Sequence, residues 1–277
     1  MGYGGLGLVI DCGGSVVNRE ANVEDPKPFR VLGVQVDAVQ IPGVIDEMEG
    51  WICTRGGTHF IAVTNVDSVM QAWHCDSFRQ ILNAADLTVP DGMPLVWLGR
   101  LKGHGMERRV YGPDLLLDFC LATRSKGYSH FFYGGSAGVP EKLADSLVQH
   151  CPSLRVVGAY SPPFHPLTPE EDRETVERIN QAAPDVLWVG LGCPKQERWM
   201  FEHRHCLSVP VMVGVGAAFD FYTGRVAQAP RWMREHGLEW LFRLRQEPRR
   251  LWRRYLIHNT EFVYRVCLEL AGLGRND

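Results

Sequence analysis

The chain has 277 residues, 45% hydrophobic residues and a formal net charge of −3. This composition is typical of an ordinary globular protein with one large domain, or a domain plus an appendage. No apolar run reaches the ~18–20 residues that cross a bilayer. The N-terminus has no cationic start and only a short apolar patch, so a signal peptide is not expected. We therefore expect any contact with a membrane to be peripheral.

The charge is unevenly distributed along the chain. Residues 225–254 contain nine Arg and three Glu, and neither Lys nor Asp, so this segment carries about +6 on an otherwise acidic body. A basic segment of this kind indicates an anionic partner, which could be membrane headgroups, a diphosphate or nucleic acid.

The cysteines show no metal-binding spacing. There is no C-x-x-C pair, and most lie in apolar surroundings, as in Phe-Cys-Leu-Ala around Cys120. We expect reduced thiols in a cytoplasmic protein. The eight positions are 12, 53, 75, 120, 151, 193, 206 and 267.

The expected elements alternate regularly from residue 29 onward. Residues 1–28 are Gly-rich and then polar, which predicts a loosely ordered extension. The apolar run at 29–39 predicts strand structure, and the run at 41–55 predicts a helix. Further strands are expected at 59–65, 86–89, 129–133, 154–160, 185–190 and 209–215. Helices are expected between them at 66–83, 93–102, 113–127, 138–150, 169–182 and 194–204.

Strands that alternate with helices of ten or more residues indicate βαβ units and a parallel sheet. The runs Val-Leu-Trp-Val-Gly at 186–190 and Val-Met-Val-Gly-Val at 211–215 lack polar alternation. Such runs are typical of strands whose two faces are both covered. We therefore predict an α/β domain over residues 29–224, with a Rossmann-like, mostly parallel sheet flanked by helices.

The pattern contains only helices from about residue 230 onward. The runs at 232–246 and 248–270 mix aromatic and aliphatic residues with Arg, and Pro248 suits the first turn of the second helix. We predict a helical C-terminal appendage over residues 225–277. Arginine interleaved with aromatic residues is typical of helices at a membrane surface, but docking on the body through the apolar face would give the same pattern. The aromatic residues in question are Trp232, Trp240, Trp252 and Tyr255.

Asp91 is the strongest candidate for a catalytic group. It follows the predicted strand at 86–89 and precedes a helix-like apolar pattern. Ligands of α/β enzymes bind at the carboxyl ends of the strands, and a carboxylate there can act as a general base. The alternative is a helix N-cap, and the two roles are compatible. Thr64 and Asn65 end the preceding strand, and we expect them on the same rim.

Two glycine-rich loops follow predicted strands. Gly134, Gly135 and Ser136 come directly after the first of these strands. Backbone amides at such a position, together with the helix that follows, can bind a phosphate, although a plain tight turn is the alternative. In the second loop, Gly192 lies just before the start of a helix. That helix start carries three polar residues that are candidates for nucleotide binding, Lys195, Gln196 and Glu197.

Asp220 and Tyr160 are further candidates from the ends of strands. Asp220 follows the predicted strand at 209–215 closely, where it is either a ligand-binding residue or a turn residue. Tyr160 ends another strand, where its ring could stack on a base or a sugar, or pack in the core.

Several common motifs are absent from the sequence. Neither glycine pattern completes a dinucleotide fingerprint, and there is no P-loop, no H-E-x-x-H and no G-x-S-x-G. No D-x-D pair exists to hold a divalent metal against a diphosphate. If the protein handles a diphosphate, its charge must be met by Arg, Lys, backbone amides and helix ends.

Seven segments in this order resemble the WecG/TagA/CpsF glycosyltransferases, over about residues 30–260. The matching segments are FIAVTNVDSVM, ADLTVPDGMPLVW, RRVYGPDLL, FFYGGSAGVPEKLA, DVLWVGLGCPKQERWM, GVGAAFDFYTGRVAQAPRWM and GLEWLFRLRQEPRRLWRRYL. The resemblance implies an inverting, metal-independent enzyme without a cofactor. Such enzymes move N-acetylmannosamine or a related sugar from a UDP donor to N-acetylglucosamine linked through diphosphate to undecaprenol, in the assembly of cell-surface polysaccharides such as teichoic acid.

The resemblance also implies roles for particular residues. Asp91 matches the proposed catalytic base, and Thr64 and Asn65 match polar residues of the same pocket. Arg225 and Arg231 are the candidates for binding the acceptor diphosphate from the appendage. The candidates for donor binding are Asn65, Arg109, Gly134, Gly135, Ser136, Tyr160, Gly192, Lys195, Gln196, Glu197 and Asp220.

Alternatives remain open at this stage. One is a glucosyl or other hexosyl transferase of exopolysaccharide assembly, and another is a non-catalytic protein that binds a nucleotide sugar. A nucleic-acid binder is disfavoured because no recognition module is present. The expected partners are a UDP-sugar, a polyprenyl-diphosphate-linked acceptor and an anionic membrane surface at the cytoplasmic face, with homo-oligomerisation left open.

Overall fold

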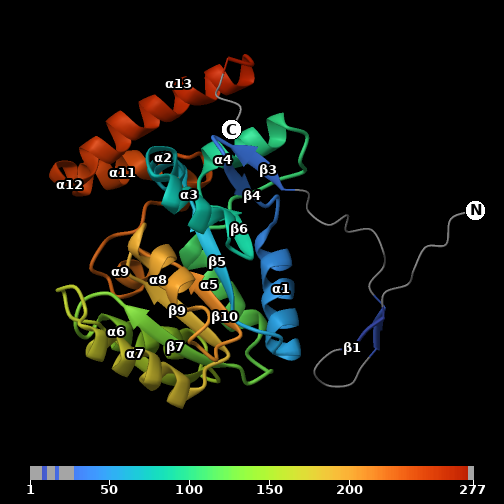
Figure 1. The fold of residues 1–277 in the computed structure, drawn as a ribbon, viewed down its shortest axis with the longest axis vertical. Coiled ribbons are helices and arrows are strands. Elements are labelled where there is room, and N and C mark those ends of the chain that lie inside the picture. Colours follow the sequence, from blue (N-terminus) through green and yellow to red (C-terminus); the bar gives the residue numbers. More distant parts are fainter. Residues whose placement is uncertain (1–7, 11–15, 19–27, 274–277) are drawn as a thin grey trace, which may run out of the picture.

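A computed structural model describes residues 8–10, 16–18 and 28–273 of the chain. Its centre is a six-stranded sheet, in which every pair of neighbouring strands is parallel, in the order β6-β5-β10-β9-β7-β8 (Figure 1). The predicted α/β fold with a parallel sheet flanked by helices is confirmed. The strands are β5 (His59–Thr64), β6 (Leu87–Pro90), β7 (Ser129–Gly134), β8 (Arg155–Tyr160), β9 (Val186–Gly190) and β10 (Val211–Gly214).

Helices cover both faces of the sheet, which explains why the central strands are apolar without interruption. One face packs on α1 (Ile41–Thr54), α5 (Gly112–Ala122), α6 (Val139–His150) and α9 (Ala218–Tyr222). The other face packs on α7 (Pro169–Ala182) and α8 (Lys195–His203). The strands β9 and β10 are therefore buried from both sides, as their sequences predict.

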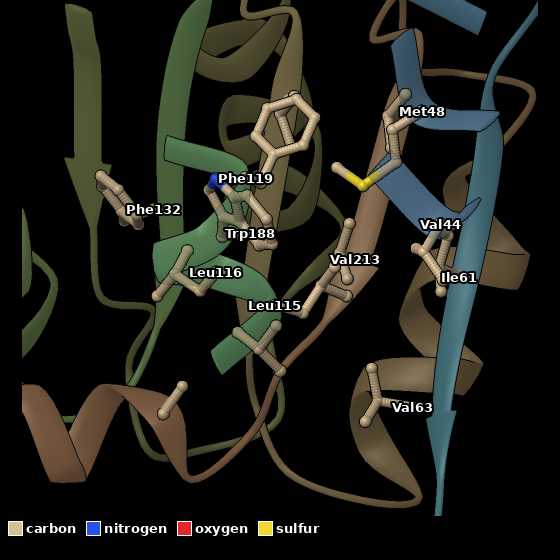
Figure 2. Close-up of a cluster of buried hydrophobic side chains, with 14 of the residues drawn as sticks. Val44, Met48, Ile61, Val63, Leu115, Leu116, Phe119, Phe132, Trp188 and Val213 are labelled. Carbon is tan, nitrogen blue, oxygen red and sulfur yellow. The ribbon is translucent and has the colours of Figure 1, made fainter. Parts of the chain in front are cut away.

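The larger core cluster shows how alternate strand residues meet the helices (Figure 2). Ile61, Phe132, Trp188 and Val213 come from four neighbouring strands and point to the same face, since side chains alternate along a strand. The helices contribute Val44, Met48, Leu115, Leu116 and Phe119 to the same cluster.

Some elements are shorter or more broken than the sequence predicts. The expected helix at 66–83 is two helices, α2 (Val66–His74) and α3 (Asp76–Asn83), because Cys75 between them is extended. The expected strand at 29–39 is a hairpin of β3 (Phe29–Val31) and β4 (Val34–Val36), outside the main sheet. Leu32 and Gly33 both have positive φ there, as a tight hairpin turn requires. Helix α4 (Met93–Leu101) follows β6 as expected.

The appendage consists of short helices that end in one longer run. They are α10 (Arg231–Glu235), α11 (Glu239–Gln246), α12 (Pro248–Trp252), a π-helical turn η1 (Arg253–His258) and α13 (Asn259–Leu270). The expected single helix at 232–246 is interrupted at Gly237, whose φ is +72°. Figure 1 shows these elements, in red, on the side of the molecule that carries α2 and α4.

The N-terminal extension, the cysteines and the membrane-spanning potential of the helices are the remaining features of the fold. Within residues 1–28, β1 (Leu8–Ile10) and β2 (Val16–Asn18) form an antiparallel pair, and most of the expected extension lies outside the described residues. Cys53 is disulfide-bonded, so the expectation of reduced thiols is wrong at that position, whereas Cys75, Cys120, Cys151, Cys193, Cys206 and Cys267 are free. No helix in the described ranges is both long and apolar enough to cross a membrane.

Candidate active site

A cavity of about 740 Å³ lies at the carboxyl ends of four neighbouring strands, β6, β5, β10 and β9. Its floor is formed by the residues that follow these strands, such as Asn65, Asp91, Gly192 and Gly216. Its opposite wall comes from the appendage, namely α11, η1 and α13. The volume is within the range of small-molecule sites, and the location is where open α/β sheets bind ligands.

Asp91 lies in the floor of this cavity, one residue beyond β6. Its backbone N–H donates to the carbonyl of Thr64 at 2.7 Å, so the end of β5 fixes its position. The following helix begins at Met93 with Gly92 as its N-cap, and no side chain caps it. The capping role considered for Asp91 is therefore wrong, and its carboxylate is free to face the cavity.

The surroundings of Asp91 weaken it as an acid. Burial raises its pKa from 3.8 to about 7, the Arg109 guanidinium opposes this rise, and the charge of Glu239 adds to it. Arg109 Nη1 lies 3.4 Å from Asp91 Oδ1. A carboxylate with a pKa near neutrality is well matched to removing a proton from a hydroxyl group at physiological pH.

Arg109 links this floor to the appendage. Its Nη2 is paired with Glu239 Oε2, and the Tyr111 hydroxyl donates to Glu239 Oε1 at 2.8 Å. The guanidinium also lies 4.1 Å from the centre of the Tyr111 ring. Glu239 is buried at the start of α11, so the appendage places a carboxylate inside the body of the protein. Arg109 thus lies where the sequence analysis expects it, but its two partners are both carboxylates.

Gln196 is held from two sides at the first turn of α8. The Gly192 N–H donates to Gln196 Oε1 at 3.2 Å, and Gln196 Nε2 donates to Glu197 Oε1 at 2.9 Å. Glu197 is buried, and burial raises its pKa to about 7. Its Oε2 accepts no hydrogen bond in the described part of the chain. Glu197 therefore contacts the cavity-lining Gln196 but does not line the cavity itself, whereas Gly192 and Gln196 do.

Two further arginines reach the cavity from the appendage, Arg243 on α11 and Arg254 in η1. Arg254 Nε lies 3.2 Å from Asp67 Oδ2, and His258 Nδ1 lies 2.8 Å from Asp67 Oδ1. Arg243 makes no ion pair within the described residues, and its Nε is buried without a hydrogen-bond partner. The guanidinium of Arg243 is therefore the cationic group of the cavity that is most available to an anion.

Several predicted residues lie elsewhere. Thr64 is buried, its hydroxyl donates to the Ala62 carbonyl at 3.3 Å, and it does not line the cavity. Its contribution is the backbone carbonyl that positions Asp91. Lys195 is exposed and also lies outside the lining. Asn65 does line the cavity, and its side chain accepts from the Ser68 N–H as the N-cap of α2.

The first glycine loop has a packing role in this structure. A Cβ at Gly134 would lie 2.6 Å from the carbonyl carbon of Gly190, so this glycine allows two neighbouring loops to touch. The Gly135 N–H donates to the Gly190 carbonyl at 3.0 Å, and the Ser136 carbonyl accepts from the Ser161 hydroxyl at 2.8 Å. None of the three predicted phosphate-binding residues lines the cavity.

Tyr160 and the two predicted appendage arginines are also outside the lining. Tyr160 ends β8, the sheet edge opposite to β6, where the Arg178 guanidinium lies 4.3 Å from its ring centre. Arg225 is exposed, and the side chain of Arg231 lies outside the described part of the structure. Asp220, by contrast, lines the cavity as predicted, on the short helix α9.

The sequence analysis missed Asp67, Glu239, Arg243 and Arg254. Glu239 and Arg243 are four residues apart on α11, and this spacing puts both on one helix face. That spacing is visible in the sequence, but the sequence does not show which face of the helix is directed toward the cavity. Asp67 and Arg254 are brought together by a long-range contact between α2 and η1, and no local pattern in the sequence predicts this contact.

No group of three His, Cys, Asp or Glu side chains suited to holding a metal occurs among the residues that the structure describes. The expectation of a metal-independent reaction stays a prediction.

Comparison with known proteins identifies the family of this chain. The model of the glycosyl transferase WecG/TagA/CpsF family matches residues 29–276, nearly the whole chain. The chain belongs to the WecG/TagA/CpsF family of glycosyltransferases. The predicted family is thereby confirmed, and so is the prediction that the protein is an enzyme.

Curated relatives carry one and the same name. A protein from Bacillus spizizenii is 29% identical over 230 residues, which cover 83% of this chain and 86% of the relative. One from Staphylococcus aureus is 26% identical over 239 residues, which cover 86% and 91%. Both are named N-acetylglucosaminyldiphosphoundecaprenol N-acetyl-beta-D-mannosaminyltransferase. A third relative of that name, from Bacillus subtilis, is 29% identical over 71% of this chain and 74% of its own length.

Proposed function

We propose that this glycosyltransferase moves an N-acetylmannosaminyl group from a UDP donor to N-acetylglucosamine linked through diphosphate to undecaprenol. The relatives' name supports the transferred sugar and the acceptor. The observation that carries the proposal is Asp91, a cavity carboxylate with a pKa of about 7 at the carboxyl end of β6.

In this reaction Asp91 removes the proton from the acceptor hydroxyl. The resulting oxygen attacks the anomeric carbon of the donor sugar, and the bond to the UDP oxygen breaks with its electron pair leaving on UDP. Attack from the side opposite to UDP inverts the anomeric configuration. Protonated Asp91 then returns its proton to solvent. A single carboxylate is sufficient for this sequence, because the UDP anion is a good leaving group once its charge is stabilised.

The charges of the cavity suggest how that stabilisation occurs. Arg243 makes no ion pair in the described structure, and we assign it to a diphosphate of the substrates. Gln196 and Asp220 follow β9 and β10, and we assign them to the donor side. This arrangement requires no divalent cation, so we propose a metal-independent reaction.

The outer surface of the appendage supports action at a membrane. Trp232, Trp252, Leu256 and Ile257 are exposed, with 44–58% of each side chain accessible. Arg249 and Arg253 are exposed beside them along the chain. Apolar and cationic side chains together suit the interface of an anionic bilayer, and we propose a peripheral position at the inner face of the plasma membrane.

The test is release of UDP by the purified protein, with a short-chain prenyl-diphosphate-N-acetylglucosamine acceptor and a panel of UDP-sugars, in EDTA. We expect acceptor-dependent release with UDP-N-acetylmannosamine and its loss in Asp91→Asn. Turnover with UDP-glucose instead would favour the hexosyl alternative. Binding of UDP-sugars without turnover on any acceptor would overturn the proposal in favour of a non-catalytic binding protein.

A further inference from the structure

The cavity has an apolar end that the catalytic groups do not use. This end lies between α4 and α13. Met93, Trp97 and Leu98 line it from α4. From α13 it is lined by Phe262, Val263, Val266 and Cys267. These residues recur at the spacing that puts them on one face of each helix, so the two helices face each other across the cavity.

The two helices run in the same direction. At their C-terminal ends Lys102 Nζ lies 2.9 Å from Glu269 Oε1, which ties the last turns together. At their N-terminal ends lie the polar groups of the cavity, Asp91 just before α4 and Arg254 in η1 just before α13. Each wall therefore passes from polar to apolar in the same direction, away from the reaction centre.

The apolar end continues to the surface. Trp97 is 50% exposed and Val263 is 60% exposed, although both line the cavity. Leu101 is 66% exposed one turn after Trp97 on α4, and Leu270 is 51% exposed two turns after Val263 on α13. The apolar walls thus form a channel that is open to the outside. These exposed apolar residues continue the lining of the cavity and are not isolated on the surface.

We propose that this channel between α4 and α13 binds the first isoprene units of the lipid-linked acceptor. The inference rests on the proposed function, because it deepens the acceptor site proposed there. The acceptor in the relatives' name has a sugar, then a diphosphate, then a polyprenol. The cavity repeats this order, with Asp91 for the sugar, arginines for the diphosphate and the apolar channel for the hydrocarbon. From Asn259 to Cys267 the helix α13 extends about 12 Å at 1.5 Å per residue, so its apolar wall leads away from the arginine that precedes it.

Binding can be measured without turnover by alkylation of cysteine. Cys267 lies in the channel and Cys206 lies beyond the end of α8, and both are exposed and free. We expect farnesyl diphosphate, at concentrations below micelle formation, to slow alkylation of Cys267 in the wild-type protein and leave Cys206 unchanged. Inorganic pyrophosphate should protect neither. Equal reactivity of Cys267 with and without farnesyl diphosphate would overturn the inference, even if the enzyme proves active.

A kinetic test uses acceptors that share N-acetylglucosamine diphosphate and carry either a methyl group or a C5, C10 or C15 prenyl chain. The KM of the wild type should fall more than about tenfold from the methyl to the C15 acceptor, since burial of additional apolar surface in the channel stabilises the complex. In Trp97→Ala and Val263→Asn most of this dependence should be lost, because the KM for the C15 acceptor should rise more than the KM for the methyl acceptor. Phe164→Ala, an exposed aromatic residue outside the cavity, serves as the control and should behave as the wild type.

The outcomes separate the two proposals. No turnover with any acceptor, together with protection of Cys267 by farnesyl diphosphate, would reject the proposed reaction and retain the prenyl site. Turnover with the same chain-length dependence in wild type, Trp97→Ala and Val263→Asn would reject the channel and retain the reaction. Protection of Cys267 that depends on protein concentration alone would mean that a second copy of the chain covers the channel, which also overturns the inference.

Discussion

Asp91 and Glu239 are 148 positions apart in the chain and contact the same guanidinium, that of Arg109. Asp91 belongs to the α/β body and Glu239 to the appendage, so the position of the appendage determines the electrostatic environment of the catalytic carboxylate. Glu239 acts on Asp91 in two ways. Its negative charge raises the pKa of Asp91 directly, and it shares with Asp91 the Arg109 guanidinium, whose charge lowers that pKa.

Replacement of Glu239 by Gln should therefore lower the pKa of Asp91. The Gln variant retains a hydrogen-bond acceptor for Tyr111 but removes the charge, which leaves Arg109 to pair with Asp91 alone. We expect the acidic limb of the pH profile of kcat/KM to move to lower pH. The matched control is Glu174→Gln, an exposed carboxylate on α7, which should leave the profile in place. If the acidic limb of the pH profile of Glu239→Gln stayed at the same pH as in the wild type, Glu239 would not control the pKa of Asp91.

Asp91→Asn should stabilise the folded protein at neutral and alkaline pH. The folded-state pKa of about 7 is above the ordinary 3.8, so the wild type is most stable relative to the variant when Asp91 is protonated. This advantage is lost as the pH rises from about 4 to about 7, because Asp91 ionises in the unfolded chain over this range while the folded protein keeps it protonated. The difference in free energy of unfolding, variant minus wild type, should increase by about 2–3 kcal/mol between pH 5 and pH 8. Urea unfolding at both pH values measures this gain, and an unchanged difference would show that the pKa of Asp91 is not raised.

Glu197 should act on the donor through Gln196. Glu197→Gln keeps an oxygen that accepts from Gln196 Nε2, whereas Glu197→Met removes it and frees the Gln196 amide to turn. We expect Glu197→Met to raise the KM for the UDP-sugar about tenfold, the loss of roughly one hydrogen bond to the substrate, and to leave kcat nearly unchanged. Glu197→Gln should restore most of the affinity. Glu202→Gln, on the exposed side of the same helix, is the control. An equal rise of the KM for the UDP-sugar in both Glu197 variants would indicate that the charge of Glu197, and not its hydrogen bond to Gln196, is required.

Asp67 should hold the appendage on the body. It contacts both Arg254 and His258 of η1 and also accepts from Gln71 Nε2 at 2.9 Å. Asp67→Asn should lower the free energy of unfolding by about 1–3 kcal/mol, between the values for exposed and buried ion pairs. Hydrogen exchange should rise in η1 and α13 while β9 and β10 remain protected. The exposed Asp145→Asn is the control, and uniform exchange in both variants would argue against this local role.

Local patterns in the sequence predict most of the body of the protein. Uninterrupted apolar runs such as 186–190 identify the central strands, and Asp91 is recognisable because it directly follows β6, a strand at the edge of the sheet. The break at Cys75 was missed because the apolar period continues from α2 into α3, and only the backbone shows the extended residue. Similarly, the interruption at Gly237 depends on close packing, since a Cβ there would lie 3.1 Å from that of Met93.

The candidate site is only partly predictable because its other half comes from the appendage. Gly134 and Tyr160 lie at the carboxyl ends of strands, as Asp91 does, and the sequence alone does not distinguish the three positions. What separates them is the order of strands, which puts β7 and β8 at the far side of the sheet from β6. Arg225 and Arg243 both belong to the basic segment 225–254, and the sequence does not show which of them reaches the cavity. Only the packing of α11 places Arg243 there.

The most direct test is the pH dependence of kcat/KM for UDP release with a prenyl-diphosphate-N-acetylglucosamine acceptor, in wild type and in Asp91→Asn. The rate of the wild type should rise tenfold per pH unit up to a pKa of about 7 and then level off, because Asp91 must be deprotonated to act as the base. Asp91→Asn should fold normally, lose activity by about 10²–10⁴-fold and show no such limb. An active Asp91→Asn variant that keeps the same acidic limb would contradict the assignment of Asp91 as the catalytic base.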